Sequence, residues 1–221
     1  MVLFVKSLDL SNPLSLAGFL KKDKDLPFDG PETILPIPPD APTEIPRIIL
    51  KSNNGVFSCN VSANRIDLFF KETGQSNLSS DEVVKRTKKY LEKINEDIRD
   101  NFNARTHRIA TVFNIITELS VSSKDFLKRR YLNKHVVKDV FEAQLNFLSR
   151  KKIGDFKINK WFRINTLRKK TDPKDDKAIQ VIFDINTLPE IDYDISSQSI
   201  NQFVDMVYKG VSSSLKSILE D

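Results

Sequence analysis

The sequence contains few side chains whose types and spacing could perform chemistry. Its two histidines, His107 and His135, do not belong to a set of His, Cys and carboxylate residues of the kind that holds a metal ion, and we interpret both as surface residues. The single cysteine, Cys59, lies in an alternating apolar segment, residues 56–62. We therefore expect a buried thiol at Cys59 and not a nucleophile.

A group of carboxylates follows an apolar segment near the end of the chain, where divalent-metal nucleases often place acidic residues. The group comprises Asp184, Glu190, Asp192 and Asp194. Metal ligands must converge from several segments, which spacing along one loop does not establish. We interpret Asp194 as a residue that helps to start the last helix.

Sequence motifs for phosphate binding or acyl transfer are absent. The chain has only 6 Gly and contains no GxxxxGK[ST], GxGxxG or GxSxG pattern. The sequence therefore predicts no catalytic residue, no metal ligand and no cofactor. A non-enzymatic protein is the favoured interpretation, and an enzyme with a dispersed active site is kept as the third hypothesis.

The most promising feature is a block of positive charge. Residues 124–177 contain 17 basic and 7 acidic residues, whereas residues 1–123 are neutral and residues 178–221 are acidic. Three basic triplets are expected near the ends of elements, where long cations can reach phosphates, and an aromatic residue among them can stack on bases. The candidate polyanion-binding residues are Lys128, Arg129, Arg130, Arg150, Lys151, Lys152, Trp161, Arg163, Arg168, Lys169 and Lys170.

The same charges have a plainer interpretation. Basic clusters commonly decorate solvated turns and protect the edge strands of sheets from pairing with other chains. The charge asymmetry permits an anionic partner without requiring one.

The elements that must position these residues form a pattern that occurs twice. Three alternating segments, residues 45–52, 56–62 and 65–71, precede an amphipathic helix that ends near Phe102. Residues 107–119 form a central strand that is apolar on both sides, so we expect burial on both faces. A short helix follows at residues 123–132. Three more strands, residues 140–149, 156–167 and 178–186, then precede a long helix over residues 197–219.

These elements predict an α+β fold. We expect one strongly twisted antiparallel sheet of about seven or eight strands, in two meander-plus-helix units, with both long helices packed on one face. The predicted organisation is a single domain, residues 1–221. It comprises an N-terminal strand and Pro-rich arm (1–46), a first meander plus helix (47–102), a central strand and short helix (103–139), and a second meander plus helix (140–221). The arm either packs on its own domain or binds a partner.

Composition indicates the setting. The 39% hydrophobic and 29% charged residues are typical of a soluble globular protein, and no segment approaches the roughly 20 apolar residues of a membrane helix. The first ten residues lack the pattern of a signal peptide. A single cysteine is consistent with a reducing environment, so we expect a cytoplasmic protein that does not contact a membrane.

Three stretches resemble a sporadically distributed prokaryotic family of uncharacterised single-domain α+β proteins. They are PRIILKSNNGVFSCNVSANRIDLFF (46–70), the following helix with RIATVFN (108–114), and IQVIFDI with the closing helix (179–219). The resemblance implies the fold and a cytoplasmic setting, and it implies no catalytic residue. Its patchy distribution would suit a mobile-element, toxin–antitoxin or phage-defence context.

Two functions remain open at this point. The favoured one is a protein-binding or regulatory role in which the sheet edges and the Pro-rich arm contact another protein or a second copy of the chain. The alternative is a nucleic-acid-binding protein that uses the basic block, residues 124–177.

Overall fold

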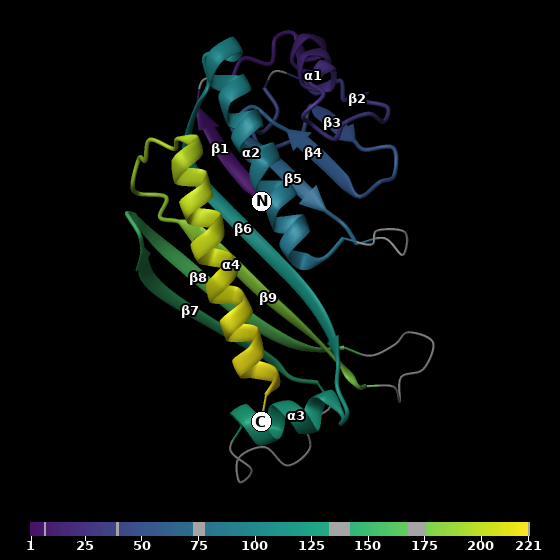
Figure 1. Cartoon of the computed structure of the whole chain (residues 1–221), viewed down its shortest axis with the longest axis vertical. Helices are drawn as coiled ribbons and strands as arrows, with labels where there is room; N and C mark the ends of the chain where they lie inside the picture. Colours follow the sequence, from purple (N-terminus) through teal and green to yellow (C-terminus); the bar gives the residue numbers. More distant parts are fainter. Residues whose placement is uncertain (7, 39, 73–77, 133–141, 168–175, 221) are drawn as a thin grey trace. The chain divides into compact units, whose positions relative to one another are not determined.

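The computed structural model describes all residues except 7, 39, 73–77, 133–141, 168–175 and 221. The described residues form an α+β fold with four helices and nine strands (Figure 1). In chain order these are β1 (Val2–Lys6), α1 (Pro13–Lys22), β2 (Thr33–Ile34), β3 (Ile48–Lys51), β4 (Phe57–Val61), β5 (Arg65–Phe70), α2 (Ser80–Phe102), β6 (Arg105–Glu118), α3 (Ser123–Tyr131), β7 (Gln144–Ile153), β8 (Phe156–Leu167), β9 (Ala178–Thr187) and α4 (Ser197–Leu219).

The strands form one antiparallel sheet in the order β2-β3-β4-β5-β1-β6-β9-β8-β7. The N-terminal strand β1 therefore lies between β5 and β6. Leu3 is opposite Ile66 of β5 and Ile109 of β6, and all three side chains are completely buried. Eight strands match segments expected from the sequence, and β2 is the additional one.

The additional strand lies inside the Pro-rich arm. Thr33 and Ile34 pair with Ile49 and Ile48 of β3, because this short stretch keeps the backbone N–H groups that the neighbouring prolines lack. Leu26 and Phe28 of the arm are buried, at 7% and 1% exposed. Residues 26–28 of the arm are therefore partly packed, whereas no described residue of 31–46 is buried, so both interpretations of the arm stay predictions.

The chain divides into two compact units. Unit 1 comprises residues 1–110, 153–156 and 187–221, and unit 2 comprises residues 111–152 and 157–186. The closing helix α4 belongs to unit 1. The single-domain organisation stays a prediction.

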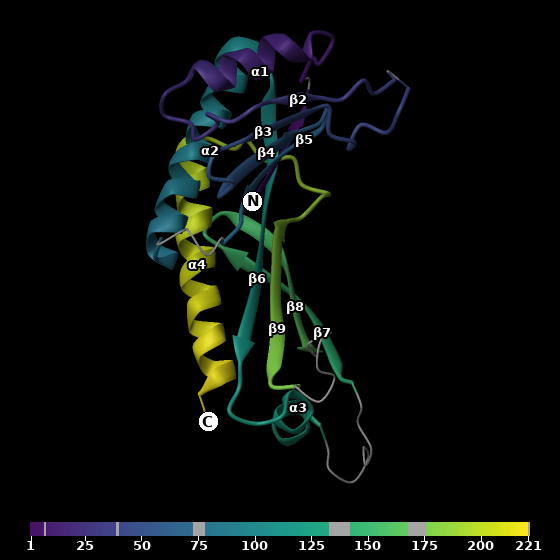
Figure 2. The same ribbon diagram turned by 90° about the vertical axis from the view of Figure 1, so that its right-hand side faces the viewer.

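In unit 1, α2 and α4 lie side by side (Figures 1 and 2). Lys88 of α2 forms an ion pair with Asp205 of α4 at 3.1 Å, and the Tyr208 hydroxyl donates to Asp81 at 2.9 Å. The apolar stripe of α4 is buried, and Phe203 packs edge-on against Phe156, with 5.7 Å between ring centroids. The amphipathic patterns predicted both helices for this reason.

Local capping explains where these helices begin and end. The Glu82 N–H donates to Ser79 Oγ at the start of α2, and Asn103 ends that helix in the left-handed conformation with φ 48°. The Ser199 N–H donates to Ser196 Oγ at 3.1 Å at the start of α4. Ser196 therefore caps the last helix. Asp194 lies two residues before this cap, and its expected help in starting the helix stays a prediction.

Unit 2 contains the second half of β6, then α3, β7, β8 and β9. Its apolar side is marked by stacked rings: Phe162 lies 6.0 Å from Phe147 and 5.2 Å from Phe183, centroid to centroid. Ile164 of β8 and Val181 of β9 are completely buried.

The expected burial of β6 on both faces holds only for part of the strand. Ile109, Ala110 and Thr111 are buried, whereas Val112 and Ile116 are 52% and 65% exposed. The prediction was therefore wrong for the second half of β6, because no element covers that side of Val112 and Ile116 in the described structure.

No helix among the described residues is long and apolar enough to cross a membrane.

Candidate polyanion-binding face of unit 2

The strands of unit 2 present two faces. Phe147, Phe162 and Phe183 contact one another and therefore share one face. Because side chains alternate along a strand, the neighbours of these rings in sequence point to the other side. That other side carries Leu148, Arg150 and Lys152 of β7 and Lys157, Asn159, Trp161, Arg163 and Asn165 of β8. We call it the Trp161 face.

Trp161 and Arg163 form the centre of this face. The Arg163 guanidinium carbon lies 5.5 Å from the Trp161 ring centroid, a distance at which a cation is attracted to the ring. Arg163 also lies 3.8 Å from the Asp184 carboxylate on β9. The ion pair and the ring together restrain a side chain that is still 35% exposed. A planar cation held beside an indole ring is a suitable surface for a phosphate and a base.

The second basic triplet is divided between the two faces. Arg150 and Lys152 belong to the Trp161 face, and both are exposed. Lys151 points to the opposite side, where Lys160 lies with its Nζ 5.2 Å from the Phe183 ring centroid. Burial lowers the pKa of Lys160, and the positive charge of Lys151 lowers it further. Only two cations of this triplet can therefore contribute to the Trp161 face.

The remaining predicted residues are not gathered with these. Lys128, Arg129 and Arg130 form the last turn of α3, and Arg130 lies 6.0 Å from the Phe126 ring. This helix follows the C-terminal end of β6, whereas Arg150 and Lys152 lie towards the C-terminal end of β7, at the opposite end of the strands (Figure 1). Arg168, Lys169 and Lys170 lie outside the described residues.

Positive charge is distributed unequally between the two units, as it is along the sequence. Unit 2 contains 17 Lys and Arg against 8 Asp and Glu, whereas unit 1 contains 18 against 22. Carboxylates within unit 2 are too few to neutralise its cations, so this unit carries a positive field that attracts anions.

The other residues selected from the sequence do not converge. Cys59 is buried as expected, and burial raises the pKa of its thiol to about 12, so it carries no thiolate at neutral pH. His107 is half-buried, and burial lowers its pKa. Asp184 pairs with Arg163, whereas Asp192 accepts from Arg105 at 2.7 Å. No group of three metal-ligating residues occurs among the described residues.

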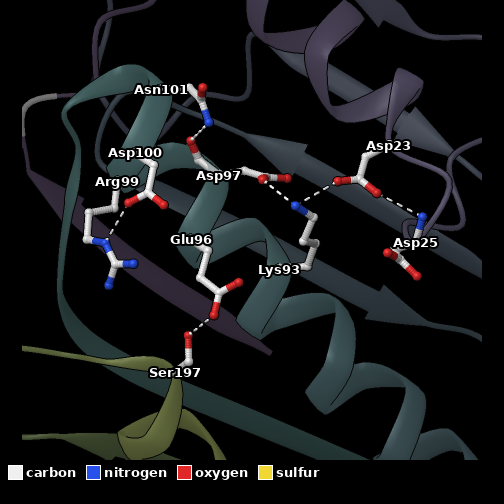
Figure 3. A network of polar contacts seen from close by, with 9 residues as sticks. All are labelled: Asp23, Asp25, Lys93, Glu96, Asp97, Arg99, Asp100, Asn101 and Ser197. Atoms are coloured by element: carbon white, nitrogen blue, oxygen red, sulfur yellow. Dashed lines mark hydrogen bonds and ion pairs between the residues drawn. The ribbon is translucent and has the colours of Figure 1, made fainter.

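One polar cluster was missed by the sequence analysis (Figure 3). Lys93 of α2 lies between two carboxylates, with Nζ 2.8 Å from Asp97 Oδ1 and 3.0 Å from Asp23 Oδ2. The Asp97 side chain is 5% exposed, and its Oδ2 has no hydrogen-bond partner among the residues that the structure describes. Burial raises the pKa of Asp97, while hydrogen bonds to the two carboxylates raise the pKa of Lys93. The cluster ties the segment after α1 to α2.

The spacing of Lys93 and Asp97 on a helix could have suggested this pair, but Asp23 is 70 residues away in the chain. Both carboxylates are occupied by the same lysine. We interpret the cluster as a structural ion-pair network.

A cavity of about 460 Å³ in unit 1 lies between the segment after α1, the turn before β4, and α2. Lys21, Lys24, Arg86 and Asp29 line it together with the rings of Phe57 and Tyr90. Charges of both signs line the cavity, so its chemistry selects no single class of ligand.

No protein-family model, no curated protein and no solved structure matches this chain. The function is therefore argued from the residues and their geometry.

Proposed function

We propose that the protein binds nucleic acid through the Trp161 face of unit 2. The observation that carries this proposal is the placement of Arg163 beside Trp161, on the same face as Arg150 and Lys152. The unit to which they belong has nine more basic than acidic residues.

Each component of the face has a defined task in this proposal. Arg150 and Lys152 are exposed at one edge of the sheet, where they can neutralise phosphates and release counterions. Trp161 offers a ring for a base. Arg163 can contact either group, because its guanidinium is planar and charged.

A protein partner is the second candidate function, and it was the favoured one from sequence. Val112 and Ile116 support it, since they are large apolar side chains at 52% and 65% exposure on one strand. Leu26 and Phe28 of the Pro-rich arm are buried, whereas the described residues of 31–46 are exposed or half-buried and stay a candidate contact surface.

Fluorescence anisotropy with labelled single-stranded and duplex DNA and RNA tests the proposal. We expect binding at low salt and a steep loss of affinity as salt rises. R150E and K152E should each weaken binding several-fold. K151E is the matched control, because it makes the same charge change in the same triplet on the opposite face, and its effect should be clearly smaller.

Absence of binding to all four nucleic acids at tens of micromolar protein would overturn the proposal. Equal losses in R150E, K151E and K152E would show that net charge matters and that the Trp161 face does not. In either case, a pull-down from the native host would test the protein-partner alternative.

A further inference from the structure

Three amide side chains form a hydrogen-bonded row across three strands of unit 2. Asn165 Nδ2 of β8 donates to Gln180 Oε1 of β9 at 3.0 Å, and Gln180 Nε2 donates to Asn114 Oδ1 of β6 at 2.9 Å. Asn165 lies four residues after Trp161 on β8, so the row is on the Trp161 face. We call these three residues the amide row.

The amide row has a direction. Every donor points from β8 towards β6, so the row ends at Asn114, which is exposed. The Nδ2 of Asn114 has no hydrogen-bond partner in the described part of the chain, and its Oδ1 has a second lone pair. Hydrogen bonds in a chain polarise one another, which strengthens the donor at the end. Asn114 therefore offers a donor and an acceptor side by side.

The neighbours of Asn114 on the same face of β6 are apolar and carry no positive charge. Val112 and Ile116 flank it two residues away on the same face of β6, and residues 111–118 contain no Lys or Arg. This part of β6 therefore has no cation that could bind a phosphate. A flat ring can pack against the two apolar side chains, while hydrogen-bonding groups on the edge of that ring contact the amide.

The Trp161 face is thus divided into two parts. The cations Arg150, Lys152 and Arg163 lie on β7 and β8. The amide and apolar part comprises Val112, Asn114 and Ile116 of β6, Gln180 of β9 and Asn165 of β8. A nucleic-acid strand that uses both parts must expose its bases to the protein, and a duplex keeps its bases stacked inside.

We propose that the ligand of this face is a single strand, whose bases lie on Trp161, Val112 and Ile116, and that the Asn114 amide contacts a base edge. This inference rests on the proposed function, because it specifies the class of nucleic acid and the residues that contact its bases.

Oligonucleotides with and without bases test the inference. A DNA 12-mer and an abasic phosphodiester of the same length carry the same phosphates, so only base contacts distinguish them. We expect wild-type protein to bind the 12-mer at least about fivefold more tightly than the abasic strand, from the usual contribution of stacking. W161A should lose about five- to 100-fold on the 12-mer, and N114A about two- to tenfold, with little change on the abasic strand.

Two controls keep these variants interpretable. T117A changes a residue of β6 on the face opposite Asn114 and should bind as the wild type does. R150E should weaken binding to both strands, because it removes a phosphate contact. Circular dichroism checks that each variant is folded, and N114A replaces an exposed side chain, so it tests the inference even if W161A unfolds.

The results separate the two proposals. Equal affinity for the 12-mer and the abasic strand, or equal losses on both in N114A and W161A, would overturn this inference and leave the proposed function standing. Tighter binding to duplex than to single strand would also overturn it. No binding to any strand would overturn both.

Discussion

The two units of this protein differ in their balance of acidic and basic residues. Unit 1 has slightly more acidic than basic residues and pairs many of them, as in Lys88–Asp205, Lys89–Asp25 and Arg105–Asp192. Unit 2 has roughly twice as many basic as acidic residues. The printed ion pairs of unit 1 join elements of its own fold, whereas unit 2 has too few carboxylates to neutralise its positive charge.

Among the described residues, unit 2 also exposes more large apolar side chains than unit 1, where Leu14 and Phe69 are 64% and 45% exposed. In unit 1 the stripes of α2 and α4 are buried, with Leu91, Ile94 and Phe203 completely inaccessible. In unit 2, Val112, Ile116 and Leu148 stay 52%, 65% and 47% exposed. In the described residues, unit 1 therefore encloses a larger core and unit 2 presents more apolar surface. Four measurements test this contrast.

The largest effect is expected in the core of unit 1. Val207 of α4 is 1% exposed, so V207D would bury a carboxylate without a partner. The cost is several kcal/mol, about the whole stability of a typical domain, and we expect unfolding. Thermal denaturation followed by circular dichroism measures it. S212D makes the same charge change at an exposed position of the same helix and should melt close to wild type. Cooperative melting of V207D at the wild-type temperature would contradict the assigned core.

A smaller loss of stability is expected when Lys93 of the polar cluster is replaced. K93M would leave Asp97 buried without its ion-pair partner, at a cost of about 2–4 kcal/mol at pH 7. Urea denaturation measures this cost. K89M is the control, because Lys89 and Asp25 are both 60% exposed and such pairs contribute at most about 1 kcal/mol.

The pH dependence of K93M has a definite sign. Burial already raises the pKa of Asp97, and loss of Lys93 should raise it further above the value in the unfolded chain. The folded state then binds more protons than the unfolded state, so stability should fall as pH rises through the pKa of Asp97. The defect of K93M should therefore be smaller at pH 4 than at pH 7. A defect independent of pH would indicate lost packing of the lysine stem as its cause.

The smallest effect on stability is expected in unit 2. Arg150 and Lys152 are exposed and surrounded by other cations, so the double variant R150E/K152E should change the free energy of unfolding by no more than about 0.5 kcal/mol. Urea denaturation of this variant beside K151E checks the expectation. A loss of about 2 kcal/mol or more would mean that these cations stabilise the fold, and the contrast between the units would fail.

The helices and all strands except β2 follow from the sequence alone, because a period of 3.6 or 2 in apolar residues leaves few alternatives. Helix α4 spans the residues that its apolar stripe predicts, and Cys59 is buried as its alternating segment indicates. Capping residues such as Ser79 are also visible in the sequence, since their hydrogen bonds are local.

Which segments contact one another follows from the tertiary structure and not from local sequence patterns. It inserts β1 between β5 and β6, brings Asp23 to Lys93, and joins Asn165, Gln180 and Asn114 into one row. It also leaves Val112 and Ile116 exposed, although their apolar character suggested burial. The physical reason is that periodicity reports which side of a strand is apolar, whereas burial and side-chain partnership depend on what packs against that side.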